Sequence, residues 1–147
     1  MRGRRCLVLA LLLLPVSATA SLGGDEASVR VDQTGLKGSL RISRAEACSI
    51  HEIATASGTV VREYLSADGR VFGIWWHGHT LPDLRRLLGA HYDRYREAPR
   101  ARRAERSSRR VVLPDLVVES SGHMRSFSGK AWLPGRLPSG IGPDDIR

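Results

Sequence analysis

Cysteine is scarce in this chain of 147 residues, which holds only Cys6 and Cys48. Cys6 lies in an N-terminal leader, so cleavage of the leader leaves Cys48 alone and excludes an intramolecular disulfide. Cys48 stands near Ile50 and Ile53, which favours a buried apolar thiol. A reactive thiol or an intermolecular disulfide has no neighbouring residue in the sequence to support it.

The sequence also lacks the motifs that bring catalytic groups together. It has no glycine-rich phosphate loop, and neither Ser49 beside His51 nor Ser121 beside His123 lies in a Gly-x-Ser-x-Gly context. The paired carboxylates Asp144-Asp145 fall in a segment rich in Pro and Gly, which favours a solvated helix start. We therefore expect no enzymatic activity and no cofactor.

Long apolar runs are confined to the first twenty residues. Three arginines precede the apolar stretch Cys6–Leu14, which Pro15 and the small-residue site Ala18-Thr19-Ala20 follow. The stretch is half the roughly 20 residues needed to span a bilayer. This order predicts a cleavable signal peptide over residues 1–20, export to the periplasm or beyond, and no transmembrane segment after cleavage.

Basic residues are concentrated in one short segment. Without the leader the chain has 20 basic and 15 acidic residues, and the excess lies in residues 100–110. The basic residues of this segment are Arg100, Arg102, Arg103, Arg106, Arg109 and Arg110. We interpret it as a solvated basic loop, with contact to anionic envelope lipids as the alternative. Nucleic acid is not expected as a partner, because export removes the chain from it and no aromatic residues are interspersed among the arginines.

The alternation of apolar residues predicts five strands. Strands are expected over 48–55, 59–65 and 71–76, then over 110–119, where Pro114 interrupts the pattern, and over 123–133. The run 71–76 is apolar on both faces, as in a central strand, and Gly73 within it indicates a bulge or a close backbone approach. Residues 21–47 are expected to be weakly structured, and residues 134–147 to form a Pro/Gly-rich tail.

One helix is predicted between the third and fourth strands. Thr80 is a suitable N-cap, Pro82 fits the first turn, and an apolar face follows at helical spacing. That face comprises Leu84, Leu87, Leu88, His91, Tyr92 and Tyr95. The fold class expected is α+β: residues 48–133 forming an antiparallel sheet of about five strands, in the order β-β-β-α-β-β, with one amphipathic helix on a face.

A series of short motifs resembles a known family. In chain order these are Ser57-Gly58-Thr59, Val61-Arg62-Glu63-Tyr64, Gly69-x-Val71-Phe72, Leu81-Pro82-Asp83-Leu84, Leu87-Leu88-Gly89, Gly122-His123-Met124-Arg125 and Ala131-Trp132-Leu133-Pro134. Together they resemble an uncharacterised family of small exported proteobacterial proteins, domain of unknown function 2844. The resemblance extends from about residue 22 to 147. It implies an envelope or secreted protein and supplies no catalytic residues, and the segment 100–110 matches none of its motifs.

Two groups of residues remain as candidate sites. His77 and His79 form a His-x-His pair, which on a strand points both rings to one side and is half of a metal site. No third ligand follows from the spacing, so we favour ordinary loop residues and expect no tight metal binding. Trp75, Trp76 and Trp132 are candidates for ligand stacking, although tryptophans on strands more often belong to the core. Adjacent Trp75 and Trp76 must point to opposite faces, so one of them is exposed unless both faces are covered.

From the sequence we expect an envelope-associated or secreted binding module without catalytic activity, whose partners are anionic envelope lipids or another envelope protein. The alternative is a small metal-dependent or hydrolytic periplasmic enzyme that uses His77 and His79. Convergence of these histidines with a third ligand in one cleft would favour the alternative.

Overall fold

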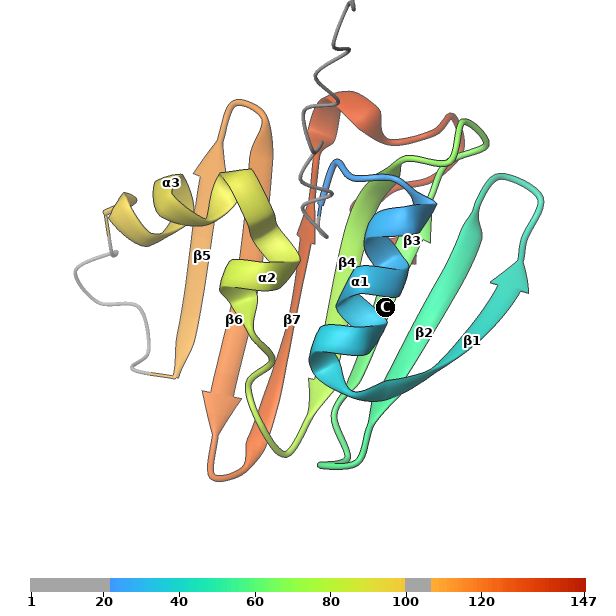
Figure 1. Cartoon of the computed structure of the whole chain (residues 1–147). Helices are drawn as coiled ribbons and strands as arrows, with labels where there is room; N and C mark the ends of the chain where they lie inside the picture. The colour runs from blue at the N-terminus through green and yellow to red at the C-terminus, as the bar shows by residue number, and fades with distance from the viewer. Residues whose placement is uncertain (1–21, 100–106) are drawn as a thin grey trace, which may run out of the picture.

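The computed structural model describes residues 22–99 and 107–147, and this part of the chain is built on one antiparallel sheet of seven strands (Figure 1). The spatial order is β1-β2-β3-β4-β7-β6-β5. The strands are β1 (Gly38–Arg44), β2 (Ser49–Thr55), β3 (Val60–Leu65), β4 (Val71–Gly78), β5 (Ser108–Leu113), β6 (Leu116–His123) and β7 (Ser126–Trp132). Two meanders, β1 to β4 and β5 to β7, join where β4 pairs with β7. β4 is therefore the central strand, as its apolar sequence predicts.

Three short helices lie on one face of the sheet: α1 (Glu26–Leu36), α2 (Leu84–Leu88) and α3 (Tyr92–Glu97) (Figure 1). Leu87 and Leu88 of α2 are fully buried, and Tyr95 of α3 is nearly so. They share one core with Val29 of α1 and the fully buried Trp76 of β4. The predicted packing of Leu87 and Leu88 is confirmed.

The C-terminal segment packs against the opposite face. After β7 the chain forms 3-10 turns at Pro134–Arg136 and Pro143–Asp145. Ile146 is 1% exposed, and it shares a second core with Tyr64, Phe72 and Trp132. A Cβ added to Gly73 would lie 2.8 Å from Cδ1 of Ile146, so the expected close approach at Gly73 is to this segment. The predicted tail is thus part of the fold.

The prediction of a five-stranded sheet with one helix is wrong. Residues 21–47, expected to be weakly structured, hold α1 and β1. Residues 110–119 were expected to form one interrupted strand, but the chain reverses after Leu113 and the two parts pair as β5 and β6. The next turn lies at Met124-Arg125, both with positive φ, and not at 120–122. Strand β6 therefore includes residues 120–122, which lie between the two strands expected from the sequence.

The single helix expected from the apolar spacing is interrupted. Gly89 has a φ of +49°, in the left-handed region, and residues Gly89–His91 form a 3-10 turn between α2 and α3. The helix also begins later than predicted, because Asp83 and not Thr80 caps it by accepting a hydrogen bond from the Arg86 N–H.

α1 is a polar helix with little apolar surface. The side chain of Asp25 accepts a hydrogen bond from the Ser28 N–H at its start, and Lys37 ends it in the left-handed conformation. Its buried residues are Ser28, Val29 and Asp32, of which only Val29 is apolar. Such a helix gives almost no apolar periodicity, which explains why the sequence pattern did not indicate it.

Candidate functional site

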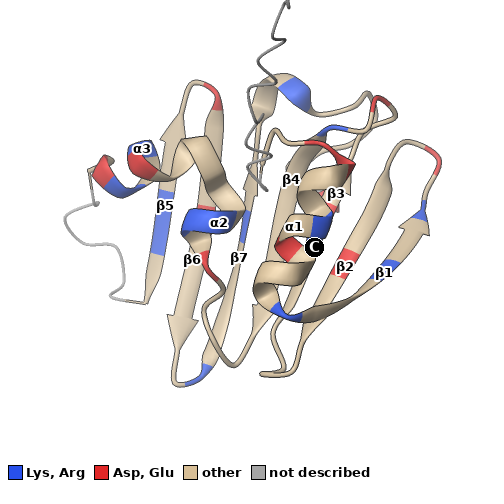
Figure 2. Ribbon diagram, in the orientation of Figure 1, with Lys and Arg blue, Asp and Glu red and all other residues tan. Residues whose placement is uncertain are grey.

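A row of charged residues crosses the whole sheet on the face opposite the helices. The strand register aligns one residue from each strand, in the spatial order Arg41, Glu52, Arg62, Trp75, Lys130, Glu119 and Arg110. We call this set the charged row. Basic and acidic residues alternate in it, as the colours on β1, β2 and β5 show in part (Figure 2), with a tryptophan at the central strand. Cross-strand neighbours of opposite charge stabilise a sheet by a few tenths of a kcal/mol to about 1 kcal/mol per pair.

A second row lies beside it on the same face. The register aligns Ser39, Ala54, Val60, His77, Ser128, Ser121 and Ser108. The last three members, on β7, β6 and β5, form what we call the hydroxyl row. Their strands are about 4.8 Å apart, so the three hydroxyls span ~10 Å. The hydroxyls of Ser121 and Ser128 lie 2.9 Å apart and hydrogen-bond to each other.

The members of these two rows on β5, β6 and β7 line an open groove of about 430 Å3. Trp75 forms one side of it, and Asp144, Ile146 and Arg147 of the C-terminal segment border it. The remaining lining residues are Ser108, Arg109, Arg110, Glu119, Ser120, Ser121, Ser128, Gly129 and Lys130. A groove of this volume is in the range of pockets that bind small ligands. The C-terminal segment therefore covers one part of this sheet face and leaves the groove beside it.

Two ion pairs lie in the groove. Nε of Arg110 lies 2.9 Å from a carboxylate oxygen of Glu119. Nζ of Lys130 donates to the main-chain oxygen of Pro143 at 2.8 Å and lies 3.8 Å from Asp144. Ion pairs of this exposed kind contribute up to about 1 kcal/mol each, so they orient the side chains more than they stabilise the fold.

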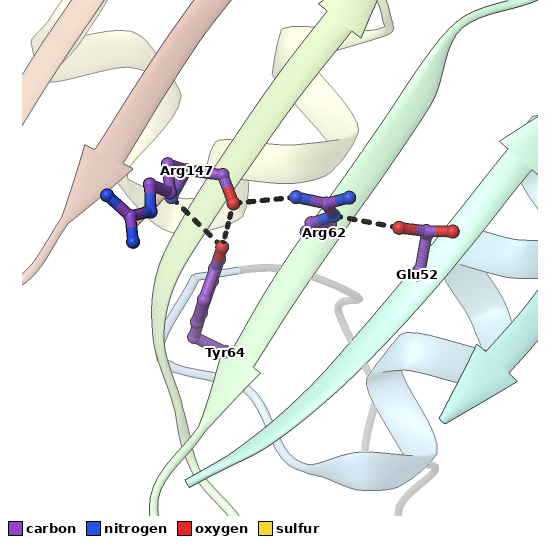
Figure 3. Close-up of polar contacts among 4 residues, drawn as sticks. All are labelled: Glu52, Arg62, Tyr64 and Arg147. Atoms are coloured by element: carbon purple, nitrogen blue, oxygen red, sulfur yellow. Dashed lines mark hydrogen bonds and ion pairs between the residues drawn. The ribbon is translucent and has the colours of Figure 1, made fainter. Parts of the chain in front are cut away.

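The other half of the charged row holds the end of the chain in place (Figure 3). Nε of Arg62 donates to Glu52 at 2.7 Å, and its Nη1 donates to the main-chain oxygen of Arg147 at 2.8 Å. The Tyr64 hydroxyl donates to the same oxygen and accepts from the Arg147 N–H. Burial raises the pKa of Tyr64 above its usual value, so the hydroxyl keeps its proton for this bond. These contacts fix the border of the groove.

The three tryptophans occupy different environments. Trp76 is buried under the helices and Trp132 is buried in the core of the opposite face, so neither presents a surface for stacking. Trp75 is half-buried beside the groove. The Arg62 guanidinium lies 4.9 Å from the centre of its ring, and the His77 ring lies nearly parallel at 6.0 Å. Of the three candidates, only Trp75 reaches the groove.

His77 and His79 do not lie in one cleft with a third ligand. His77 is exposed and belongs to the second row, beside Ser128. His79 lies against the turn between β2 and β3, where a Cβ added to Gly58 would be 3.0 Å from the His79 Nδ1 atom. Among residues 22–99 and 107–147, no three His, Cys, Asp or Glu side chains are placed to hold a metal ion.

From residue 108 on, the arginine-rich segment is strand and not loop. Ser108, Arg109 and Arg110 begin β5. Arg109 donates to the main-chain oxygens of Tyr95 and Ala98 at 2.6 and 3.1 Å, and its guanidinium stacks 4.3 Å from the Tyr95 ring. Arg109 thus joins α3 to β5, and Arg110 lies in the groove. The other candidates for polyanion contact, Arg100, Arg102, Arg103 and Arg106, lie outside the described residues.

A buried pair of acids lies between α1 and β3, and the sequence analysis did not identify it. Asp32 and Glu63 are both 0% exposed. None of their four oxygens receives a hydrogen bond from an N–H or O–H group of the described residues. Carboxylates only accept hydrogen bonds, so the two groups can bond to each other only when one is protonated. The signal was present in β3, where Glu63 lies between Val61 and Leu65 on a face that is otherwise apolar.

Burial determines the protonation of this pair. It raises the pKa of Glu63 well above its usual range, and the neighbouring Asp32 raises it further. Burial likewise raises the pKa of Asp32 to about 7, although the bond from Glu63 and the charge of Arg86 oppose the rise. At neutral pH Glu63 therefore keeps its proton, and its O–H is the only group of the pair able to donate a hydrogen bond to Asp32. The Arg86 guanidinium packs on α1 at Gly35, where an added Cβ would lie 2.3 Å from its Cζ, and its charge acts on Asp32 from there.

Cys48 is partly buried beside the core that the C-terminal segment completes. Burial and the nearby Asp145 carboxylate raise the pKa of its thiol. A raised pKa reduces the thiolate fraction at neutral pH, which agrees with the interpretation of an unreactive thiol.

Comparison with known proteins supports one assignment. No curated protein and no solved structure matches this chain. One family model, described as "Protein of unknown function (DUF2844)", matches residues 18–146, which confirms the family that the motifs resemble. The chain belongs to the DUF2844 family.

Proposed function

We propose that this protein is an exported binding module and that its ligand occupies the groove over β5, β6 and β7. The observation that carries the proposal is the uneven coverage of one sheet face. The C-terminal segment buries the apolar residues on β3, β4 and β7, whereas the adjoining polar surface on β5 to β7 is left as a groove of about 430 Å3. A half-buried tryptophan beside polar groups is a common composition for a binding site.

Two features support binding over catalysis. Two cations in the groove are engaged in ion pairs with carboxylates of its lining, Arg110 with Glu119 and Lys130 with Asp144. The buried acids Asp32 and Glu63 lie on the helix-covered face, on the other side of the sheet from the groove.

Export is part of the proposal and is supported by the leader sequence. Residues 1–20 have the order of charged, apolar and small residues that signal peptidase recognises. Within residues 22–99 and 107–147, none of the helices has the length and apolar character needed to cross a membrane. The mass of the protein recovered from the envelope fraction of its native host tests this part. We expect a chain that begins near Ser21, and an uncleaved chain in the cytoplasm would contradict export.

Selective retention tests the groove. Wild-type protein, a groove variant and a control variant are immobilised and exposed to envelope extract, and retained small molecules are compared by mass spectrometry. The groove variant is Ser121→Leu, which fills the hydroxyl row with an apolar side chain. The control is Ser39→Leu, which makes the same change on the same sheet face but on β1, at the far edge of the sheet and outside the hydroxyl row.

We expect the wild type and the Ser39→Leu variant to retain a component that the Ser121→Leu variant loses. Equal retention by all three would place the binding site elsewhere. Retention by none of them would contradict the proposal of a binding module.

A further inference from the structure

We infer that the groove binds a neutral oligosaccharide. The inference rests on the proposed function and adds the chemical class of the ligand. It follows from three properties of the lining: Arg110 and Lys130 are paired with carboxylates, its hydroxyls are aligned, and an aromatic ring stands at one side.

Pairing of Arg110 and Lys130 with carboxylates disfavours an anionic ligand on β5, β6 and β7. Arg110 is bonded to Glu119, and Lys130 is engaged by Pro143 and Asp144. An anionic ligand would have to displace these partners and would then meet two carboxylates. A neutral ligand with many hydroxyl groups can instead donate to the carboxylates and accept from the cations without breaking the pairs.

The hydroxyl row adds hydrogen-bonding groups at regular intervals. Ser108, Ser121 and Ser128 lie on three adjacent strands, about 4.8 Å apart. Each hydroxyl can both donate and accept a hydrogen bond. Ser121 and Ser128 use one hydrogen bond between them, so both hydroxyls can form further hydrogen bonds to a ligand. A row of such groups matches a ligand that carries hydroxyls repeatedly along its length.

Trp75 supplies the apolar contact that a sugar ring needs. One face of a pyranose ring presents mostly C–H groups, which pack on an aromatic surface. The Arg62 guanidinium lies 4.9 Å from the centre of the Trp75 ring and the His77 ring lies nearly parallel to it at 6.0 Å, so these neighbours restrict the motion of the ring. The sugar would pack on the part of the ring that lines the groove. A ring that is already fixed loses little conformational entropy on binding.

The experiment is a calorimetric titration of the purified protein with hexasaccharides. Chitohexaose, cellohexaose and maltohexaose are the neutral probes, and a heparin-derived hexasaccharide is the anionic probe. We expect at least one neutral probe to bind at concentrations up to about 5 mM. Its affinity should stay unchanged between about 0.05 and 0.5 M salt, because no net charge is neutralised.

Variants show whether the groove is the site. Trp75→Ala should weaken binding of the neutral probe by about tenfold. If Trp75→Ala does not fold, Ser121→Leu provides the test, because its position on the strand is exposed. This variant should weaken binding of the neutral probe by at least about fivefold. Ser39→Leu should leave binding unchanged.

The results distinguish this inference from the proposed function. Failure of every neutral probe overturns the saccharide class, as does binding of the heparin fragment alone with loss at high salt. In either case, an envelope component that the Ser121→Leu variant fails to retain would leave the groove as a binding site for another ligand. Equal affinity in the wild type and the Ser121→Leu variant would overturn the assignment to the groove.

Discussion

The buried acid pair predicts that this protein loses stability as the pH rises through neutrality. Asp32 has a pKa of about 7 in the folded chain against an ordinary value of 3.8, and the pKa of Glu63 lies well above its usual range. Between the ordinary pKa of each acid and its raised pKa in the folded chain, the folded state keeps a proton that the unfolded state has released. The free energy of unfolding therefore falls as the pH rises from about 4.

The shift at Asp32 sets a lower bound on the size of the effect. It is about 3 pKa units at about 1.4 kcal/mol per unit, so Asp32 alone accounts for a loss on the order of 4 kcal/mol between pH 4 and 8. The raised pKa of Glu63 adds to this loss in the same direction. This is a large part of the 5–15 kcal/mol that stabilises a typical domain. Burial lowers the pKa values of His51 and His91, which gives a smaller trend of opposite sign near pH 6. The comparison must therefore be made between variants.

Urea unfolding at a series of pH values measures the effect, with tryptophan fluorescence as the signal. The double variant Asp32→Asn/Glu63→Gln keeps the shape of the pair and removes its titration. Its stability should decline much less than that of the wild type between pH 4 and 8. The control Glu52→Gln, which changes an acid on the other face, should keep the wild-type slope. Parallel profiles for the wild type and the double variant would refute the reasoning.

Two further predictions concern packing, and each has a matched control in chemical denaturation. Leu88→Ala should cost about 2–5 kcal/mol because the side chain is fully buried, whereas Arg85→Ala on the exposed side of α2 should cost less than about 0.5 kcal/mol. Gly129→Ala should cost about 1–3 kcal/mol, because its Cβ would lie 2.3 Å from Cζ2 of Trp76. Gly135→Ala should be nearly neutral, since no atom lies within 4 Å of the added Cβ. Similar losses within either pair would contradict the packing described.

The elements that the sequence predicted well are those whose burial is visible in local spacing. β2, β3 and β4 lie within two residues of their predicted bounds. The apolar positions Leu87 and Leu88 are buried as the helical spacing indicated. In each case one face or both faces are apolar, so the period of the pattern directly reflects contact with the core.

The elements that the sequence did not predict depend on contacts between distant parts of the chain. α1 is held by a polar cap, one buried valine and the pair of Asp32 with Glu63, none of which produces an apolar period. The 3-10 turns after β7 are ordered because Ile146 packs over Gly73, a contact between residues far apart in the chain. Local propensity carries no information about either contact.

The candidate site could be predicted only in part, because it also depends on contacts between distant parts of the chain. That Trp75 and Trp76 face opposite sides of the sheet follows from the strand period alone. Which of them is buried depends on where the helices and the C-terminal segment pack. Alignment of Ser108, Ser121 and Ser128 depends on the register of three strands, and the position of the β6–β7 turn, which sets part of that register, was mispredicted.

The central claim is that the groove over β5, β6 and β7 binds the ligand of this protein. The most direct measurement is a two-dimensional 15N NMR spectrum of the protein recorded with and without small molecules extracted from the native envelope. We predict that the shifts concentrate at the Trp75 indole and at the amides of Ser121, Ser128 and Lys130, while Ser39 and α1 stay unchanged. Shifts confined to α1 or to β1, with the groove signals unmoved, would contradict the claim.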